Sequence, residues 1–251
     1  MDEVRPPETI DWCRMDTPTR PPLAASEDVA RLLSHSLLRP ELTTARVLEG
    51  IQLARRYAVA AVSVRPCDVE LALRHLEGST VIPASVVGFP HGSQTTSAKL
   101  FEARDLLRRG AREIGVVIAT SRLLSREFQH AQTELAQIAE ACHKERATVT
   151  VILENAWLTE ELKIIALRCA ERAEADAVST STGFAPTGYT AADVALMRKY
   201  LPEETGVEAA GGVATLADVL EAYQAGCTRI STTQIAVILE EWKARMVQPT
   251  A

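Results

Sequence analysis

Short apolar segments alternate with helix-period segments along almost the whole chain, and this alternation limits the fold more than any other feature. Near-continuous apolar strands are typical of a parallel sheet that is covered on both faces. Eight such strands, each followed by a helix, close into a (β/α)₈ barrel. We therefore predict an α/β, single-domain TIM barrel. Its strands are expected at 34–38, 60–64, 81–87, 114–119, 148–153, 177–181, 206–210 and 228–232, and its helices at 43–57, 67–76, 97–109, 125–145, 159–173, 191–200, 215–225 and 233–245.

The two ends of the chain set the predicted domain limits. Residues 1–25 carry five prolines, which disfavour a long helix or a ladder strand, so this part is predicted to be an extension. Ser26 is a suitable N-cap and is followed by Glu27 and Asp28, which predicts a helix that caps the bottom of the barrel. We expect the barrel to occupy 26–246 and a short tail to occupy 247–251.

Composition narrows the classes of partner. The net charge of −6 and the lack of a basic run argue against nucleic acid and anionic membrane, and favour a small-molecule substrate. Five cysteines without CxxC spacing argue against a disulfide framework or a zinc site. No apolar run reaches the ~18 residues of a membrane span, and the first residues lack the apolar part of a secretion signal. A cytoplasmic protein is expected.

The sixth predicted strand holds the most informative stretch, ADAVSTSTGF at 175–184. Ser179 and Ser181 lie two positions apart and so share one face of the strand, while Gly183 permits a turn directly after it. Active sites of (β/α)₈ enzymes lie at the carboxyl ends of the strands. Both serines are therefore expected at the site.

Three stretches resemble the deoxyribose-phosphate aldolase family. ADAVSTSTGF is similar to the family pattern A-D-x-V-K-T-S-T-G-F, and LSHSLLRP at 33–40 is similar to I-D-H-T-L-L-K-P. GFPHG at 88–92, followed by Thr95, Thr96, Lys99 and FEA at 101–103, resembles G-F-P-x-G-x-x-T-T-x-x-K-x-F-E-A. The resemblance spans most of the chain and implies the barrel fold of that family.

The same resemblance implies that the family's charged groups are replaced here. The Schiff-base lysine of the family falls on Ser179, and a serine cannot form an imine. The strand-four aspartate falls on Gly115, the strand-seven lysine on Glu208, the strand-one aspartate on Ser34 and a strand-five lysine on Thr150. The chain is identified as a divergent member that lacks the Schiff-base lysine.

None of the chain's five lysines offers an obvious replacement. Lys99 is expected near the mouth of the barrel, at the start of a helix, with a surface or capping role. Lys144 is expected at a helix end, and Lys163, Lys199 and Lys243 on helix faces toward solvent. Imine chemistry is therefore not expected.

The family holds a phosphate with backbone N–H groups of two turns, aided by helix N-termini. In this chain Gly211 and Gly212 match the first turn, whereas Ala214 stands where the family usually has arginine. The second turn carries Thr232, Thr233 and Gln234. Whether the ligand is phosphorylated stays open.

Three residues are the candidates for catalysis. An inward carboxylate of Glu208 would be desolvated, which raises its pKa toward the range of a general acid or base; an ion pair with Arg65 or Arg39 is the equally weighted alternative. Glu154 is a second candidate, with a structural hydrogen-bonding role as its alternative. His35 is the third, although a lone histidine is usually structural.

Polar residues at strand ends and in the following loops are the candidates for binding substrate. No cofactor is predicted. A metal site would need two or three converging ligands, and His35, Glu154 and Glu208 on their different strands could converge, but no metal site is predicted. The substrate-binding candidates are Ser179, Ser181, Ser63, Arg65, Arg39, Asn155, Thr120, Gly211, Gly212, Thr232, Thr233 and Gln234.

Three functions remain open. The first is an enzyme of lyase, isomerase or cyclase type, biosynthetic in setting, that acts on a small oxygenated or carbonyl metabolite by acid/base chemistry without a Schiff base. The second is a catalytically silent barrel that binds a metabolite or a partner protein. The third is a retained deoxyribose 5-phosphate aldolase activity. The sequence also leaves a homodimer open.

Overall fold

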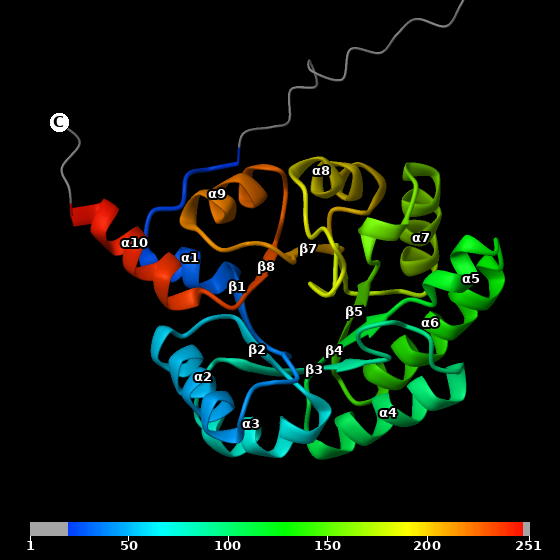
Figure 1. Ribbon diagram of the computed structural model, residues 1–251, viewed down its shortest axis with the longest axis horizontal. Helices are drawn as coiled ribbons and strands as arrows, with labels where there is room; N and C mark the ends of the chain where they lie inside the picture. The colour runs from blue at the N-terminus through cyan, green and yellow to red at the C-terminus, as the bar shows by residue number, and fades with distance from the viewer. Residues whose placement is uncertain (1–19, 248–251) are drawn as a thin grey trace, which may run out of the picture.

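The computed structural model describes residues 20–247, and the predicted extension and tail lie largely outside that range. Eight parallel strands pair in sequence order and close into a barrel, which confirms the predicted fold (Figure 1). The strands are β1 Leu33–Leu37, β2 Ala61–Val64, β3 Ile82–Val87, β4 Glu113–Val117, β5 Thr148–Ile152, β6 Ala177–Ser179, β7 Gly206–Ala210 and β8 Arg229–Thr232.

Helices fill each connection between strands and surround the barrel (Figure 1). The α-helices are α1 Ser26–Leu32, α2 Thr44–Tyr57, α3 Val69–Leu76, α4 Thr96–Arg109, α5 Thr120–Leu124, α6 Phe128–Lys144, α7 Glu160–Arg172, α8 Ala191–Tyr200, α9 Leu216–Gln224 and α10 Ile235–Val247, with short 3₁₀ turns η2 Pro66–Asp68 and η3 Asn155–Trp157. No helix within residues 20–247 combines the length and apolar character needed to cross a bilayer.

Two differences from the predicted elements have local causes. The helix predicted over 125–145 is α6, which begins only at Phe128, because Arg126 takes a positive φ of 59° that a helix cannot contain; the short helix α5 before it was not predicted. Helix α1 begins as predicted, but its N-cap is Ala25 rather than Ser26. The Asp28 carboxylate accepts hydrogen bonds from the Ala25 N–H at 2.9 Å and the Ala24 N–H at 3.1 Å, which ties the preceding chain to the first turn.

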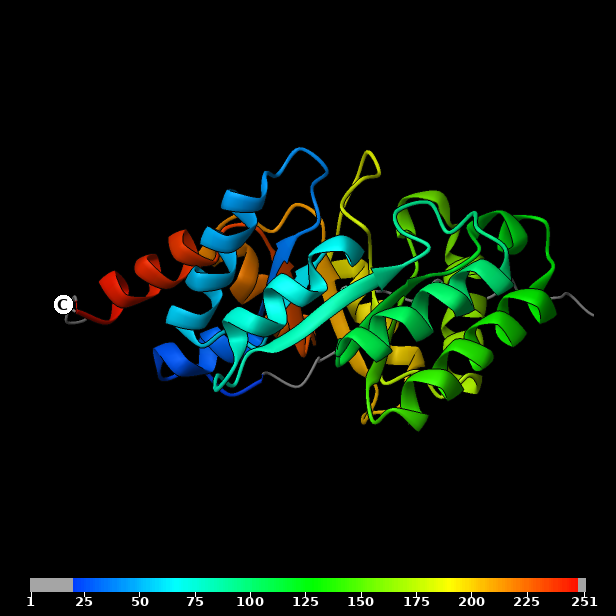
Figure 2. The same cartoon turned by 90° about the horizontal axis from the view of Figure 1, so that it is seen from below.

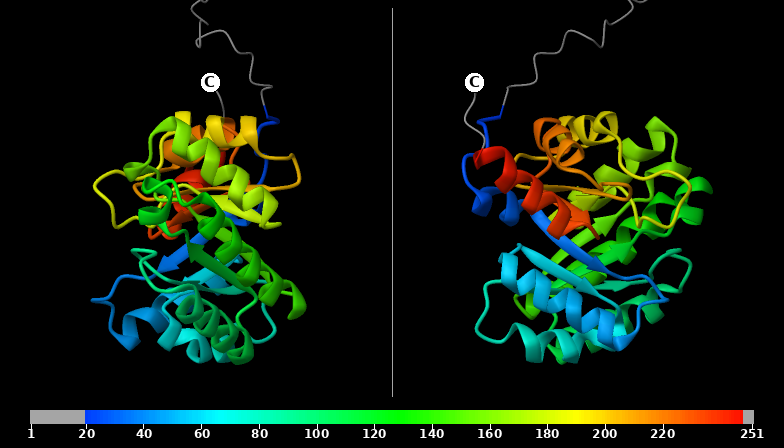
Figure 3. Two further views of the ribbon diagram at one scale, coloured as in Figure 1. Left: turned by 90° about the vertical axis from the view of Figure 1, so that its right-hand side faces the viewer. Right: turned by 60° about the vertical axis from the view of Figure 1, so that its left-hand side comes forward.

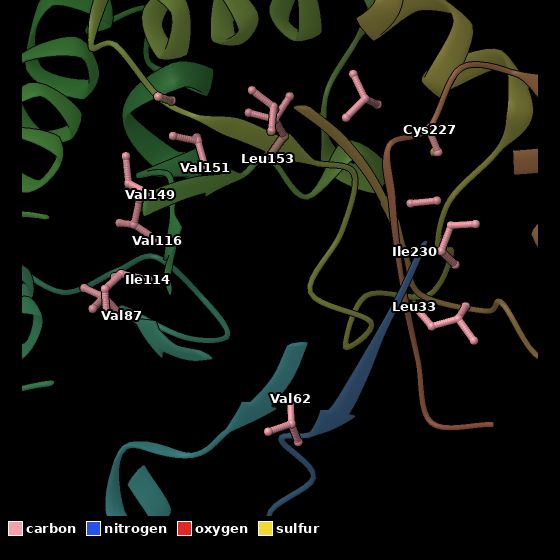
Figure 4. Packing of buried hydrophobic residues seen from close by; sticks show 14 of the residues in the cluster. Leu33, Val62, Val87, Ile114, Val116, Val149, Val151, Leu153, Cys227 and Ile230 are labelled. Carbon is pink, nitrogen blue, oxygen red and sulfur yellow. The ribbon is translucent and has the colours of Figure 1, made fainter. Parts of the chain in front are cut away.

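The main hydrophobic core lies between the strands and the helices. Alternate strand residues such as Val62, Ile114 and Ile230 are fully buried in it (Figure 4). Helix α1 packs against α10, which brings the first and last described helices together (Figure 3).

A second, smaller apolar cluster lies inside the barrel. It consists of Val86, Val117 and Ile152, from three neighbouring strands, and Leu38 and Phe89 pack against it. The inward residues of β6, β7 and β8 are polar instead, and include Ser179, Glu208, Arg229 and Ser231. The interior of the barrel therefore has an apolar side and a polar side.

The long connections rise from one end of the barrel. The loops after β1 and after β6 project on the same side of the molecule, in blue and yellow (Figure 2). All strands are parallel, so this end holds their carboxyl termini. Substrate access is expected there.

Candidate active site

A cavity of about 280 Å³ opens at the carboxyl ends of the strands and extends down into the barrel. Every strand contributes to its wall, either directly or through the loop that follows. Its polar lining consists of Ser36, Arg39, Ser63, Ser85, Glu113, Thr150, Ser181, Thr182, Glu208, Ser231, Thr232, Thr233 and Gln234, and its apolar lining includes Leu38, Val86, Phe89, Ile152 and Phe184.

Glu208 on β7 is a half-buried carboxyl that faces this cavity. The hydroxyl of Ser179, its register neighbour on β6, donates to Oε1 at 3.0 Å. Within residues 20–247 no protein group hydrogen-bonds Oε2. Burial raises the pKa of Glu208 to about 7, the charge of Glu113 adds to this rise, and Arg229 and the Ser179 hydroxyl oppose it. This carboxyl can both donate and accept a proton near neutral pH.

A second carboxyl, Glu113 at the start of β4, also lines the cavity. Its Oε2 lies 3.3 Å from Nη1 of Arg229 at the start of β8. Arg229 is also the register neighbour of Glu208. The polar interior thus holds two carboxyls and one guanidinium.

Three hydroxyl groups on the wall have no hydrogen-bond partner in the part of the chain that the structure describes. They belong to Ser36, Thr150 and Ser231, which come from β1, β5 and β8. Because none of these hydroxyls is committed to the protein, all three can bind oxygen atoms of a ligand. The wall is therefore suited to a small molecule with several oxygens.

The rim combines a cation with two aromatic rings. The Arg39 guanidinium lies 4.9 Å from the ring centre of Phe184, and that ring meets Phe89 edge to face at 5.3 Å. Arg39 forms no ion pair within residues 20–247. A stacked, unpaired guanidinium can bind an anionic group of a ligand at the cavity mouth.

The structure brings nine of the predicted site residues to the cavity wall. Gly211 and Gly212 form the turn after β7 with positive φ values of 84° and 88°, and both line the cavity. The nine are Glu208, Ser181, Ser63, Arg39, Gly211, Gly212, Thr232, Thr233 and Gln234.

Three further candidates do not line the cavity. Ser179 is fully buried and acts on the cavity through Glu208. Glu154 accepts hydrogen bonds from the Ser181 hydroxyl at 2.9 Å and from the Thr182 N–H at 3.2 Å, and so supports the loop after β6. Asn155 is buried beside it, and its Oδ1 has no hydrogen-bond partner in residues 20–247.

The remaining three candidates lie outside the cavity. His35 is on the helix-facing side of β1, where Nδ1 is 3.3 Å from the Thr232 carbonyl; burial lowers its pKa to about 4, so it is neutral near pH 7. Arg65 donates to Asp68 at 2.7 Å and does not form the alternative ion pair with Glu208. Thr120 begins α5 and donates to the Ile118 carbonyl.

The positions of the lysines correct one prediction. Lys99 has no surface or capping role: its side chain is completely buried and its Nζ lies 2.6 Å from Glu134 and 2.8 Å from the Val117 carbonyl oxygen. Lys163 is also less exposed than predicted, with 18% of its side chain accessible beside Asp193. None of the five lysines, all within residues 20–247, lines the cavity.

The comparisons with known proteins agree with this architecture. The model of the DeoC/LacD family aldolases matches residues 26–230. The deoxyribose-phosphate aldolase of Caldanaerobacter subterraneus subsp. tengcongensis is 38% identical over 217 residues, which cover 86% of this chain and 94% of that protein. The corresponding enzyme of Bacillus cytotoxicus is 37% identical over 217 residues, which cover 86% and 97%.

Solved structures of deoxyribose-phosphate aldolases are also similar to this chain. A putative deoxyribose-phosphate aldolase from Coccidioides immitis superposes with a TM-score of 0.85 at 29% identity, covering 92% of each chain. The deoxyribose phosphate aldolase of Aeropyrum pernix, which is a tetramer, superposes with a TM-score of 0.83 at 29% identity, covering 89% of this chain and 94% of that one. By sequence and by structure, this chain belongs to the DeoC/LacD aldolase family.

Proposed function

We propose that this protein is an enzyme that acts on a small oxygenated or carbonyl metabolite by acid/base chemistry without a Schiff base. The reaction is of lyase, isomerase or cyclase type, and Glu208 is the group that moves the proton. The observation that carries the proposal is a carboxyl that lines the cavity, has a pKa of about 7 and has no hydrogen-bond partner for Oε2 within residues 20–247.

The arrangement of the wall supports a reaction next to a carbonyl group. Ser179 holds Oε1 of Glu208 and so fixes the direction of the carboxyl. In its ionised form Oε2 can remove a proton from a carbon or hydroxyl of the substrate, and in its protonated form it can return one. The uncommitted hydroxyls of Ser36, Thr150 and Ser231 can hydrogen-bond the carbonyl oxygen as negative charge develops on it.

The distribution of lysines argues for chemistry that needs no imine. A Schiff base requires an unprotonated amine that can reach the substrate. Serine stands at the position where the family resemblance implies the nucleophilic lysine, and Lys99 is held in a buried ion pair behind the barrel wall. No lysine of residues 20–247 faces the cavity.

Solvent exchange tests this proposal before the natural substrate is known. A panel of aldehydes, ketones and hydroxyacids, each with and without a phosphate group, is incubated with the protein in D₂O. Proton NMR then detects loss of the C–H signal beside the carbonyl. With any active compound, Glu208→Gln is expected to slow exchange by roughly 10²- to 10⁴-fold, because the amide cannot transfer a proton.

Glu70→Gln is the matched control, since Glu70 is an exposed residue of α3 paired with Arg109. This control is expected to exchange at the wild-type rate. Exchange that proceeds equally fast in Glu208→Gln would remove Glu208 from the mechanism.

The relatives favour a second candidate, retained deoxyribose 5-phosphate aldolase activity, because the curated proteins that match carry that name. Reduction with borohydride in the presence of deoxyribose 5-phosphate distinguishes the two. Our proposal expects no covalent adduct by mass spectrometry. An adduct on Lys99 would instead establish imine chemistry from a new position.

Assembly is a further expectation from the sequence. We propose that the protein works in the cytoplasm on a small molecule, and that it forms a homodimer. Light scattering coupled to size-exclusion chromatography measures the mass against the 27.3 kDa of one chain. A mass of one chain at micromolar concentration would reject the dimer.

A further inference from the structure

One ion pair crosses the interior of the barrel from side to side. Arg229 starts β8 and Glu113 starts β4, and these two strands lie half a turn apart in the eight-stranded closed sheet. Their side chains meet with 3.3 Å between Nη1 and Oε2, and only 23% and 11% of the two side chains are accessible. Arg229 therefore reaches past its register neighbour Glu208 to a carboxyl on the opposite wall.

Apart from Arg39 at the rim, the charged groups described above in the barrel interior are therefore two carboxyls and one guanidinium. Glu113 and Glu208 both face the cavity, and Arg229 is the cation that they share. The thiol of Cys227 also interacts electrostatically with Glu208, but burial raises the pKa of this thiol to about 12, so it stays neutral. Two carboxylates beside one cation cannot both be fully compensated, and one of them favours its protonated form.

We propose that Glu113 is a positioning residue that acts through Glu208: by holding Arg229 it takes the available positive charge and leaves Glu208 as the carboxyl that keeps a proton. This inference rests on the proposed role of Glu208 in the reaction. It assigns Glu113 and Arg229 a task that is distinct from holding the barrel closed. When the surroundings of two carboxyls separate their pKa values, one carboxyl can act as an acid while the other remains a fixed charge.

The geometry predicts opposite effects for the two partners. Glu113→Gln removes a neighbouring negative charge and frees Arg229 to interact with Glu208, so the pKa of Glu208 is expected to fall from about 7 toward its ordinary value of 4.5. Arg229→Met removes the cation and is expected to move the pKa of Glu208 further upward. Arg229→Lys retains the charge and is expected to lie close to wild type.

The test is a titration of Glu208 that needs no substrate. The protein is labelled with ¹³C at the glutamate side-chain carboxyl, and the Glu208 resonance is assigned as the one missing in Glu208→Gln. Its shift is followed from pH 4 to pH 9 in wild type, Glu113→Gln, Arg229→Lys and Arg229→Met. Glu70→Gln is the control, because it removes a carboxylate from an ion pair of the same 3.3 Å separation outside the barrel.

The outcomes separate this inference from the proposed function. A lower Glu208 pKa in Glu113→Gln, with no change in Glu70→Gln, establishes the coupling even if Glu208→Gln leaves proton exchange unaffected. An unchanged Glu208 titration in Glu113→Gln overturns the inference, whatever the exchange experiment shows. If Arg229→Met does not fold, Glu113→Gln and Arg229→Lys still decide the question.

Discussion

At the scale of single residues, the role of a strand side chain depends on whether it points into the barrel or toward the surrounding helices. His35 and Ser36 are neighbours in β1, yet Ser36 lines the cavity and His35 packs behind it against α2. Successive residues of a strand point to opposite faces, so the sequence already predicted that His35 and Ser36 would point in opposite directions. The sequence did not show which of the two faces points into the barrel, since polar residues occur on both faces of this strand.

Glu208 gives a stability prediction that depends on pH. Its pKa is raised from 4.5 in the unfolded chain to about 7 in the folded protein, so its contribution to stability is fully present below pH 4.5 and is lost as pH rises to 7. That loss amounts to about 3 kcal/mol. Glu208→Gln cannot ionise, so its stability relative to wild type should increase by about this amount between pH 4 and pH 8, measured by urea unfolding.

Glu70→Gln provides the comparison, because Glu70 is exposed on α3 and its replacement should leave the pH dependence of unfolding close to wild type. Parallel curves for wild type and Glu208→Gln across this range would show that Glu208 titrates normally in the folded state.

At the scale of elements, charged side chains hold helices to strands and loops to one another. Lys99 in α4 and Glu134 in α6 form an ion pair with no exposed surface, and Lys99 also donates to the carbonyl of Val117 at the end of β4. The hydroxyl of Thr96 adds a hydrogen bond of 2.9 Å to the same carboxylate. The network fixes two helices against the strand that carries Glu113.

Breaking this network from one side should be costly. Lys99→Met leaves the Glu134 carboxylate buried without its cation, and the expected loss of unfolding free energy is about 3 to 5 kcal/mol. The double variant Lys99→Met with Glu134→Leu removes both charges and is expected to recover a large part of that loss. Chemical denaturation of the single and double variants measures the coupling. Additive losses would mean that the pair is not coupled.

The loops after β6 and β7 touch through two glycines. A Cβ at Gly188 would lie 1.9 Å from the Gly211 carbonyl oxygen, and the Tyr189 N–H donates to that oxygen at 2.9 Å. Gly188→Ala must therefore displace the loops that line the cavity, and we expect weaker ligand binding together with a loss of stability. Gly78→Ala is the control, because Gly78 has a positive φ of 71° but no atom near its Cβ position. Ligand binding should be unchanged there.

At the scale of the whole molecule, several interior positions differ together from the residues that the family resemblance implies. Ser179 and Glu208 form a hydrogen-bonded pair, and a Cβ at Gly115 would approach the Ile152 side chain to 3.1 Å. The position where the family resemblance implies an aspartate is thus partly filled by an apolar neighbour. A single substitution to the residue that the family resemblance implies would therefore leave the neighbouring side chains unchanged.

A lysine at position 179, where the family resemblance implies one, tests this dependence. In Ser179→Lys the new amine would lie beside Glu208. The carboxylate favours the protonated form of the lysine, and a protonated amine cannot form an imine. We expect little adduct after borohydride treatment with deoxyribose 5-phosphate, and more adduct in Ser179→Lys with Glu208→Gln. Mass spectrometry measures both. Equal and complete modification of the single variant would show that Glu208 does not control this position.

The sequence alone determined the eight β–α units, and with them the barrel and the end at which its loops gather. These follow from local periodicity and from the steric preferences of parallel strands. Glu208 was found because the family resemblance implies a lysine at its strand position and the sequence has a carboxylate there. Only the tertiary structure decided which charges meet. Glu113 and Arg229 lie 116 positions apart and each begins its own strand, so no local pattern links them. Their contact depends on closure of the sheet, which brings β4 and β8 to face each other across one small interior.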